Sequence, residues 1–230
     1  KYPENEKLPS FPIWSMEFGA NYKYKETTPY AQAQKSPGLI TDSNQTGSFG
    51  KDISGESWED LKRDLPSHAT REQSQFPRWK VRYIRQNREL GLKLREMDEE
   101  WFEEWLSKIQ QFPPSLQKLE WNCKWEERSM WKHVIQFRAS GVRVKRATTA
   151  PSLVAMTTTQ IPIVGWESRY MTTEECARLQ SLGDLSHLPE SDSSTFKALG
   201  NAVNSTVVRC LAANLTDRSS GLDQIGRAHV

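Results

Sequence analysis

The stretch Arg169-Tyr-Met-Thr-Thr-Glu-Glu-Cys-Ala-Arg-Leu-Gln180 carries the clearest local structural signal in the sequence. Thr172 precedes Glu175 by three positions, which is the spacing of a helix capping box. In that motif the threonine hydroxyl accepts a hydrogen bond from the glutamate backbone N–H, and the glutamate carboxylate accepts one from the threonine backbone N–H. The stretch predicts a helix that begins at Thr173 and runs through Leu179.

A second stretch, Phe196-Lys-Ala-Leu-Gly-Asn-Ala-Val203, predicts a turn followed by a final helix. Gly200 allows the backbone to approach a ligand closely, and the N–H groups that open a helix can bind a polar group. The helix is expected to begin near Val203 and to carry an apolar face made of Val207, Cys210, Leu211 and Leu215. A Gly-Asn turn before a helix is common, so this stretch alone is a weak functional signal.

Upstream of both stretches the sequence pattern is typical of strands. Four strands are expected, in two pairs: 134–138 with 142–145, and 153–156 with 161–164. Alternation in the second strand places Val142 and Val144 on one face and two basic residues, Arg143 and Lys145, on the other. A hairpin with an apolar back and a basic front is suited to reading a nucleic-acid groove.

The first half of the chain predicts irregular structure and then helices. Residues 1–76 are rich in Gly, Pro, Ser, Thr and Asn and should form few strands. From Pro77 to Pro113 the apolar residues recur at three- and four-residue steps, which predicts helix, with a division at Gly91. A short helical piece with core tryptophans is expected next, over 121–131. Helices and strands in separate runs predict the α+β class.

The charge along the helical stretch changes sign. Its first part carries Arg78, Lys80, Arg82, Arg85 and Arg88, and its last part carries Glu99, Glu100, Glu103 and Glu104. The acidic part is expected to face solvent, whereas the basic part either does the same or approaches nucleic acid.

Bulk composition bounds the function only loosely. The chain has 230 residues, a formal charge of +2 and 36% apolar residues, which fits a folded protein with a polar surface. A net charge this small does not announce a nucleic-acid binder. The span 128–166, however, contains six Lys or Arg and no Asp or Glu, so it forms either a solvated basic face or a phosphate-facing patch.

Cysteine usage and hydropathy exclude several classes. The three cysteines, Cys123, Cys176 and Cys210, lack the spacing of a disulfide framework or a zinc site, so we expect no metal and a reducing, cytoplasmic location. No apolar run approaches the roughly 20 residues of a membrane-spanning helix, and the first residues show no signal-peptide pattern.

Taken together, the two carboxy-terminal stretches resemble conserved motifs of the DNA cytosine-5 methyltransferases. The stretch 169–180 is similar to the ninth motif, Arg-x-Leu-Thr-Pro-Arg-Glu-Cys-Ala-Arg-Leu-Gln, from which it departs at Met171, Thr173 and Glu174. The resemblance implies that this element organises a small DNA-reading domain. The matched structural positions are Arg169, Thr172, Glu175 and Arg178.

The stretch 196–203 is similar to the family's tenth motif, with its Gly-Asn-Ala-Val turn. The resemblance implies that Asn201, Ala202 and Val203 line part of a pocket for S-adenosylmethionine.

Residues 136–146 and 150–154 resemble the closing half of the family's target-recognition domain, and the likeness is looser from Phe11 to Trp131. Ser152 and Leu153 take the place of the family's Thr-Leu pair, in which the hydroxyl contacts a phosphate near the extruded cytosine. The implied contacts with double-stranded DNA are Arg138, Ser140, Arg143, Lys145, Arg146, Ser152 and Leu153.

Three of the family's motifs, two for catalysis and base flipping and one for cofactor binding, have no counterpart here. The sequence contains no Pro-Cys, no Glu-Asn-Val and no Phe-x-Gly-x-Gly, so no catalytic residue is assigned. The resemblance therefore implies a carboxy-terminal fragment whose amino-terminal, Rossmann-like catalytic domain is missing. Its expected parts are a target-recognition domain at 1–165 with a helical insert at 77–131, the two motifs at 166–216, and a tail at 217–230. Residues 225–230 are similar to a translated sequencing adapter and are taken as an artefact.

Three hypotheses remain open on the sequence. The first is a restriction-modification enzyme that flips a cytosine and methylates its C5, of which this fragment alone is inactive. The second is a stand-alone, non-enzymatic DNA-binding module. The third is a half-enzyme that pairs with a separate catalytic chain.

Overall fold

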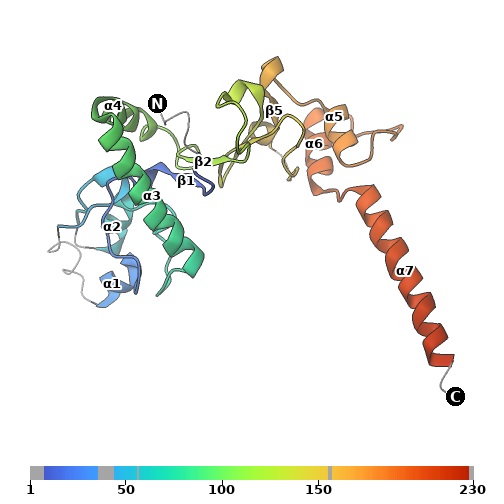
Figure 1. The fold of residues 1–230 in the computed structure, drawn as a ribbon, viewed down its shortest axis with the longest axis horizontal. Coiled ribbons are helices and arrows are strands. Elements are labelled where there is room, and N and C mark those ends of the chain that lie inside the picture. The colour runs from blue at the N-terminus through green and yellow to red at the C-terminus, as the bar shows by residue number, and fades with distance from the viewer. Residues whose placement is uncertain (1–7, 36–43, 56, 155–156, 228–230) are drawn as a thin grey trace. The chain divides into compact units, whose positions relative to one another are not determined.

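The chain divides into two compact units (Figure 1). The computed structural model describes residues 8–35, 44–55, 57–154 and 157–227. The first unit comprises residues 1–126 and 138–144, and the second comprises residues 127–137 and 145–230. Within the described residues, no helix is both long enough and apolar enough to cross a membrane.

The first unit combines helices with three strands. Its helices are α1 (Pro29–Lys35), α2 (Trp58–Asp64), α3 (Arg78–Met97) and α4 (Glu99–Ile109), with short 3-10 turns η1 (Ser15–Glu17) and η4 (Ser48–Gly50). Its strands are β1 (Ile13–Trp14), β2 (Lys118–Trp121) and β4 (Gly141–Lys145). Strand β2 runs antiparallel to β1 and parallel to β4, with Leu119 opposite Val142. The sheet is therefore mixed.

The long helical stretch divides at Asp98, and the predicted division at Gly91 is wrong. Asp98 has extended backbone, and its carboxylate accepts a hydrogen bond from Trp101 N at 3.0 Å, which caps α4. Gly91 lies inside α3 because the helix packs closely there on Phe18. A Cβ at Gly91 would come within 2.9 Å of the Phe18 ring.

The core of the first unit lies where α3 packs on η1 and β1. Met16, Phe18, Tyr22 and Ile84 are almost completely buried there. Asn87 on α3 ties the helix to the entering chain: its Oδ1 accepts from Trp14 N at 2.6 Å and its Nδ2 donates to the Pro12 carbonyl at 3.0 Å. Much of 8–76 is irregular and contributes the single strand β1 among the described residues, as predicted.

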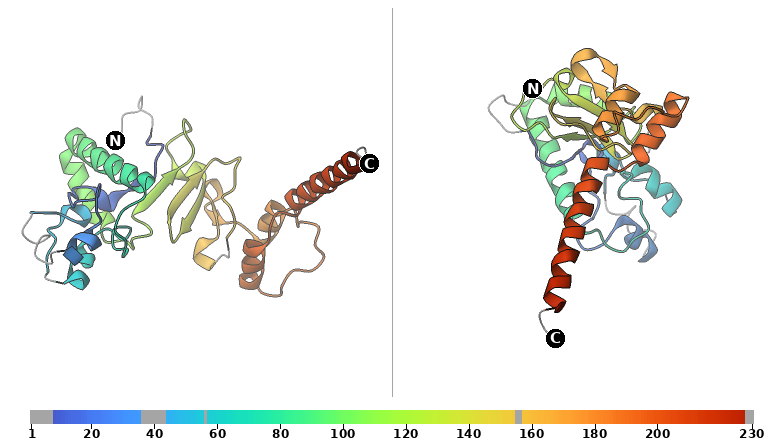
Figure 2. Two further views of the ribbon diagram at one scale, coloured as in Figure 1. Left: turned by 90° about the horizontal axis from the view of Figure 1, so that it is seen from below. Right: turned by 90° about the vertical axis from the view of Figure 1, so that its right-hand side faces the viewer.

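The second unit combines three antiparallel strands with helices. Its strands are β3 (Val134–Arg138), β5 (Ile163–Val164) and β6 (Arg169–Tyr170), and β5 pairs with both of the others. Its helices are α5 (Thr173–Leu179), α6 (Asp192–Asn201) and α7 (Ser205–Arg227), with 3-10 turns η5 (Met130–Lys132), η6 (Thr158–Gln160) and η7 (Gly165–Glu167). Helix α7 projects away from α5 and α6 in each view (Figures 1 and 2).

Several local predictions are confirmed and others are corrected. The strands at 134–138 and 142–145 and the helix at 173–179 form as expected. The prediction of a helical piece at 121–131 is wrong: Trp121 is the last residue of β2 and pairs with Val144 of β4, and the helical turn η5 begins only at Met130. Residues 153–154 form no strand, 155–156 lie outside the described residues, and the strand at 161–164 shortens to two residues.

The largest correction is α6, which was not predicted. Gly200 and Asn201 close this helix instead of forming a free turn, and the final helix begins at Ser205. Both units thus combine helices and strands, in agreement with the mixed class expected from the sequence. The assignment of residues 1–165 to target recognition stays a prediction.

Candidate functional site

The end of α5 and the end of α6 are joined by the side chain of Gln180. The side-chain Nε2 donates to the Leu199 carbonyl at 2.9 Å and to the Ala202 carbonyl at 3.1 Å. The backbone carbonyl of Gln180 accepts from Ser205 N at 3.0 Å. Gln180 is buried, so these hydrogen bonds are shielded from water. The two sequence stretches that predicted a function therefore form one structural element.

Asn204, just before α7, adds further hydrogen bonds to this junction. Its Nδ2 donates to the Leu179 carbonyl at 2.9 Å, and its Oδ1 accepts from Ser181 Oγ at 3.2 Å and from Val207 N at 3.1 Å. The last of these bonds caps the first turn of α7. Sequence analysis missed Asn204, although an asparagine just before a helix is a recognised capping signal.

An apolar cluster lies beneath the junction. Ile161, Cys176, Ala177, Phe196 and Leu199 are its buried members, and Leu153, Met171 and Leu182 pack against them. Burial raises the pKa of the Cys176 thiol to about 11, so the thiol is protonated at neutral pH. A protonated, enclosed thiol is a poor nucleophile, which agrees with a structural role for this cysteine.

Arg169 fixes the start of α5 relative to β6. Two guanidinium nitrogens of Arg169 donate to the two carboxylate oxygens of Glu175, each at 2.8 Å, and Nε donates to Glu167 at 2.6 Å. The predicted capping box is confirmed: Thr172 N donates to Glu175 Oε2 at 2.9 Å, and Glu175 N donates to Thr172 Oγ1 at 3.1 Å. Hydrogen bonds from Arg169, followed by that from Thr172, lower the pKa of Glu175 to about 2.

The three predicted cofactor residues sit on the outer side of the junction. The Asn201 side chain is exposed at the end of α6, and Val203 is 69% exposed. Ala202 is half-buried, with its carbonyl held by Gln180. An exposed amide and an exposed apolar side chain therefore lie two positions apart where α6 ends.

Ser152 and Leu153 also belong to the second unit. Leu153 packs against the apolar cluster, whereas Ser152 is exposed. The half-buried leucine therefore anchors an irregular segment in which the neighbouring hydroxyl is exposed to solvent. The side chains of Lys145 and Arg146 are half-buried, and Arg178 is exposed on α5.

The remaining predicted DNA contacts lie in the first unit, around Glu120. Arg143 donates to Glu120 Oε2 from Nε at 2.7 Å and from Nη2 at 2.6 Å. Arg138 donates to Ser140 Oγ at 2.7 Å and lies 3.7 Å from Glu120 Oε1. The predicted alternation is confirmed, since Val142 and Val144 are buried and Arg143 is only half-buried.

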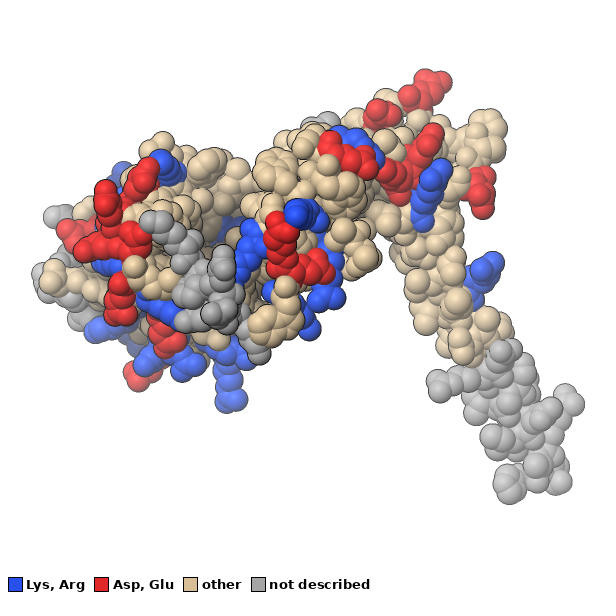
Figure 3. All heavy atoms as spheres, turned by 45° about the horizontal axis from the view of Figure 1, so that its top comes forward, with Lys and Arg blue, Asp and Glu red and all other residues tan. Residues whose placement is uncertain are grey.

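Glu120 reduces the positive charge expected of this strand face. It is brought opposite Arg143 by the parallel pairing of β2 with β4, from outside the acid-free span. Burial and the neighbouring Arg143 lower the pKa of Arg138, and Glu120 opposes that effect. On the face shown in Figure 3, basic and acidic side chains lie interspersed.

Comparison with known proteins gives one family and one relative of stated function. The sequence profile of a family described as C-5 cytosine-specific DNA methylase matches residues 20–217. The chain is 38% identical over 135 residues to the Type II methyltransferase M.AluI of Cellulosimicrobium cellulans. The match covers 58% of this chain and 25% of the relative, so the chain spans about a quarter of that protein's length. No solved structure matches.

Proposed function

The chain belongs to the C-5 cytosine-specific DNA methylase family, and we propose that it supplies the DNA-reading surface and one wall of the cofactor pocket of such an enzyme. The reaction proposed for the whole enzyme is methyl transfer to C5 of a cytosine flipped out of double-stranded DNA. The Type II name of the relative supports a place in a restriction-modification system.

The observation that carries this proposal is the junction between α5 and α6. Gln180 binds carbonyls of the second stretch and Asn204 binds a carbonyl of the first, so the family's two carboxy-terminal signatures are held together by side-chain hydrogen bonds. Asn201, Ala202 and Val203 would line the pocket, where bound S-adenosylmethionine supplies the methyl group. The junction fixes their backbone, which lets them orient a ligand at little entropic cost.

DNA contacts are proposed for two groups of residues. Arg138, Ser140 and Arg143 would contact DNA from the first unit, and Lys145, Arg146, Ser152 and Leu153 from the second. Guanidinium groups can donate two hydrogen bonds to guanine in the major groove, whereas an exposed hydroxyl such as that of Ser152 suits a phosphate oxygen.

The exposed face of α7 favours this proposal over a stand-alone DNA-binding module. Val207, Leu211 and Leu215 are between 52% and 68% exposed on one helix. An apolar face of this kind is typical of a helix covered by another domain. We propose that a catalytic domain covers it and provides the cysteine thiolate, because this sequence contains no Pro-Cys.

The test is a methylation assay with labelled S-adenosylmethionine and duplex DNA. The chain alone is expected to transfer no methyl group, and its mixture with, or fusion to, the catalytic part of a related methyltransferase is expected to methylate DNA. Methyl incorporation by the chain alone would contradict the inactive assignment. A fusion that is folded but inactive, and that binds no DNA, would count against the proposed function itself.

A further inference from the structure

Three basic side chains converge on the turn at residues 66–71 of the first unit. Lys80, in the first turn of α3, donates from Nζ to the His68 carbonyl at 3.2 Å and is buried. Lys118, the first residue of β2, donates from Nζ to Ser67 Oγ at 3.4 Å and is half-buried. Arg71 is exposed on the turn itself. These three residues and Ser67 are called the 67–118 cluster below.

No carboxylate in the described ranges forms an ion pair with these three cations. Elsewhere in the same unit basic residues do have acidic partners, such as Lys62 with Glu59 at 2.7 Å and Arg63 with Asp60 at 2.5 Å. The absence at the 67–118 cluster is therefore local and does not reflect a shortage of acidic residues in the unit.

The buried carboxylate of Glu17, which contacts His68 of the same turn, is engaged with other groups. It lies 2.7 Å from His68 Nε2, accepts from Arg88 Nε at 2.9 Å, and accepts from the hydroxyl of Tyr22. Its side chain has no exposed surface, so it cannot turn toward Lys118 or Arg71. Arg88, one of the basic residues for which nucleic-acid contact was considered, instead forms an ion pair with Glu17.

The cations of the 67–118 cluster also act on one another. Burial is the main cause that lowers the pKa of Lys118, and the charge of Arg71 lowers it further. The pKa of Lys80 is lowered by burial and then by Arg71 and Lys118. Like charges held together without an acid oppose folding, so an anion that binds between them relieves a cost already present in the free protein.

We propose that the 67–118 cluster binds a phosphodiester group of the DNA backbone. Arg71 and Lys118 would contact the phosphate, and Ser67 would donate a hydrogen bond from its hydroxyl. The buried Lys80 would attract the phosphate by its positive charge without touching it. This inference rests on the proposed function, because it assumes that the chain binds DNA. It adds a second contact region, distinct from the strand residues around Glu120.

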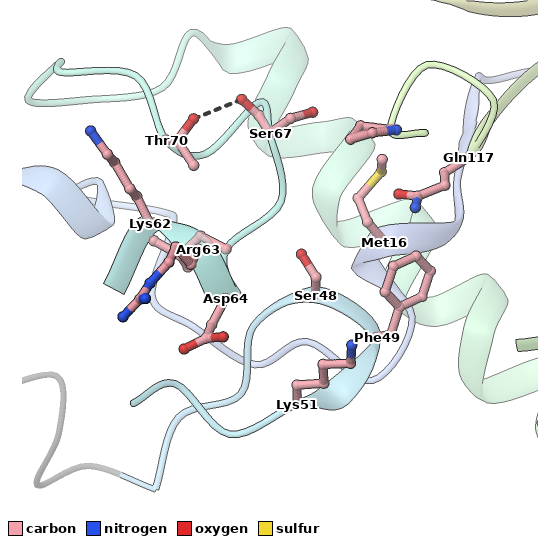
Figure 4. Close-up of a pocket in the computed structure, with 12 residues that line it drawn as sticks. Met16, Ser48, Phe49, Lys51, Lys62, Arg63, Asp64, Ser67, Thr70 and Gln117 are labelled. Carbon is pink, nitrogen blue, oxygen red and sulfur yellow. Dashed lines mark hydrogen bonds between the residues drawn. The ribbon is translucent and has the colours of Figure 1, made fainter. Parts of the chain in front are cut away.

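The space beside the cluster is open enough for a backbone segment. Ser67 and Thr70 line a cavity of about 520 Å³ together with Ser48, Lys51 and Gln117 (Figure 4). Thr70 Oγ1 donates to the backbone carbonyl of Ser67 at 3.0 Å. The Ser67 hydroxyl accepts from Lys118, and its own hydrogen can be donated to a ligand. The lining combines three hydroxyl groups and three basic side chains with one carboxylate and four apolar residues, and its hydroxyl and basic groups suit a hydrated sugar-phosphate.

The test compares DNA binding of the whole chain with that of Lys118→Met and Arg71→Met, over a range of salt concentrations. Each variant is expected to weaken binding by about threefold to tenfold at low salt and to reduce the salt slope by about one. Lys25→Met is the matched control, because Lys25 is an exposed lysine of the same unit outside the cluster. It should change neither quantity.

Thermal unfolding shows whether a variant binds DNA more weakly because its fold is less stable. Lys118→Met should leave Tm unchanged or raise it, because one of the repelling charges is removed. Arg71 is exposed, so Arg71→Met keeps the test valid if Lys118→Met lowers Tm for reasons of packing. Inorganic phosphate should raise the Tm of the wild-type chain above that in chloride of equal ionic strength, and should do so less for both variants.

Each outcome decides the proposal. Cluster variants that bind DNA like Lys25→Met overturn it, while salt-dependent binding by the wild-type chain leaves the proposed function standing. Protection by inorganic phosphate without any effect of the variants on DNA binding would assign the cluster to a free phosphate compound instead. A wild-type chain that binds no duplex DNA overturns both proposals.

Discussion

The side-chain amide of Gln180 donates to the carbonyl of Ala202 at 3.1 Å, which ties the turn after α6 directly to the end of α5. The same nitrogen also holds the Leu199 carbonyl, so one residue satisfies two backbone groups that α6 leaves open at its end.

Gln180→Leu should therefore destabilise the second unit by about 1–3 kcal/mol, because it leaves two carbonyls without their donor in a buried site. Denaturant unfolding followed by circular dichroism would measure the loss. Gln111→Leu is the control, since Gln111 donates to the Ser107 carbonyl at an exposed position. If both substitutions lower the free energy of unfolding equally, the hydrogen bonds of Gln180 at the junction do not stabilise the unit more than those of an exposed glutamine.

Glu175→Gln should remove a stabilising contribution that depends on pH. The pKa of Glu175 in the folded chain is about 2, below its ordinary value of 4.5, so its contribution is present above pH 4.5 and is lost as the pH falls towards 2. The pair with Arg169 is more than one-third exposed, so solvent screening limits the effect to about 1 kcal/mol or less.

The measurement is the difference in unfolding free energy between wild type and Glu175→Gln, at pH 7 and at pH 3. That difference should shrink at the lower pH. Glu174→Gln, on the same helical turn, serves as the control and should show a smaller difference at both values. A difference that is constant with pH would mean that the ion pair with Arg169 is not its source.

Glu120→Gln should strengthen DNA binding and steepen its salt dependence. The change removes one negative charge from the strand face and releases Arg143 and Arg138 for phosphate or base contacts. Arg143→Met should have the opposite effect. Fluorescence anisotropy with labelled duplex, at several salt concentrations, would measure both.

The control for Glu120→Gln is Glu104→Gln, which removes the same charge from the exposed pair with Lys108 on α4. If the two substitutions change the affinity equally, the effect is one of net charge, and the strand face around Glu120 has no direct contact with DNA.

Asn201→Ala should raise the KM for S-adenosylmethionine in an enzyme reconstituted with a catalytic domain, and should leave DNA affinity unchanged. The expected cause is loss of an outward amide beside the exposed Val203. Asn214→Ala is the control, because Asn214 donates to the Cys210 carbonyl further along α7. A parallel loss of DNA affinity would place Asn201 in a structural role.

Local signals explain what the sequence could predict. The capping box at Thr172, the alternation around Val142 and Val144, and the clustering of basic residues all depend on neighbours within a few positions. The helix 173–179 and the strands 134–138 and 141–145 follow from those signals, and the structure contains them.

Contacts between distant segments explain what it could not predict. Glu120 meets Arg143 only because β2 and β4 run parallel, and the 67–118 cluster needs a turn, a helix start and a strand start to converge. The break at Asp98 was missed because Gly91 is the stronger breaker by propensity alone. Close packing on Phe18 overrides that propensity.

Leu153 packs against the apolar cluster that contains residues of α5 and α6, so a displacement of one region of the second unit is transmitted to the other. Ser152, whose hydroxyl is proposed to contact a phosphate, is therefore connected through Leu153 to the helices that hold the turn proposed to line the cofactor pocket. A substitution that displaces this cluster should move both regions, so under the proposed function DNA contact and affinity for S-adenosylmethionine should change together.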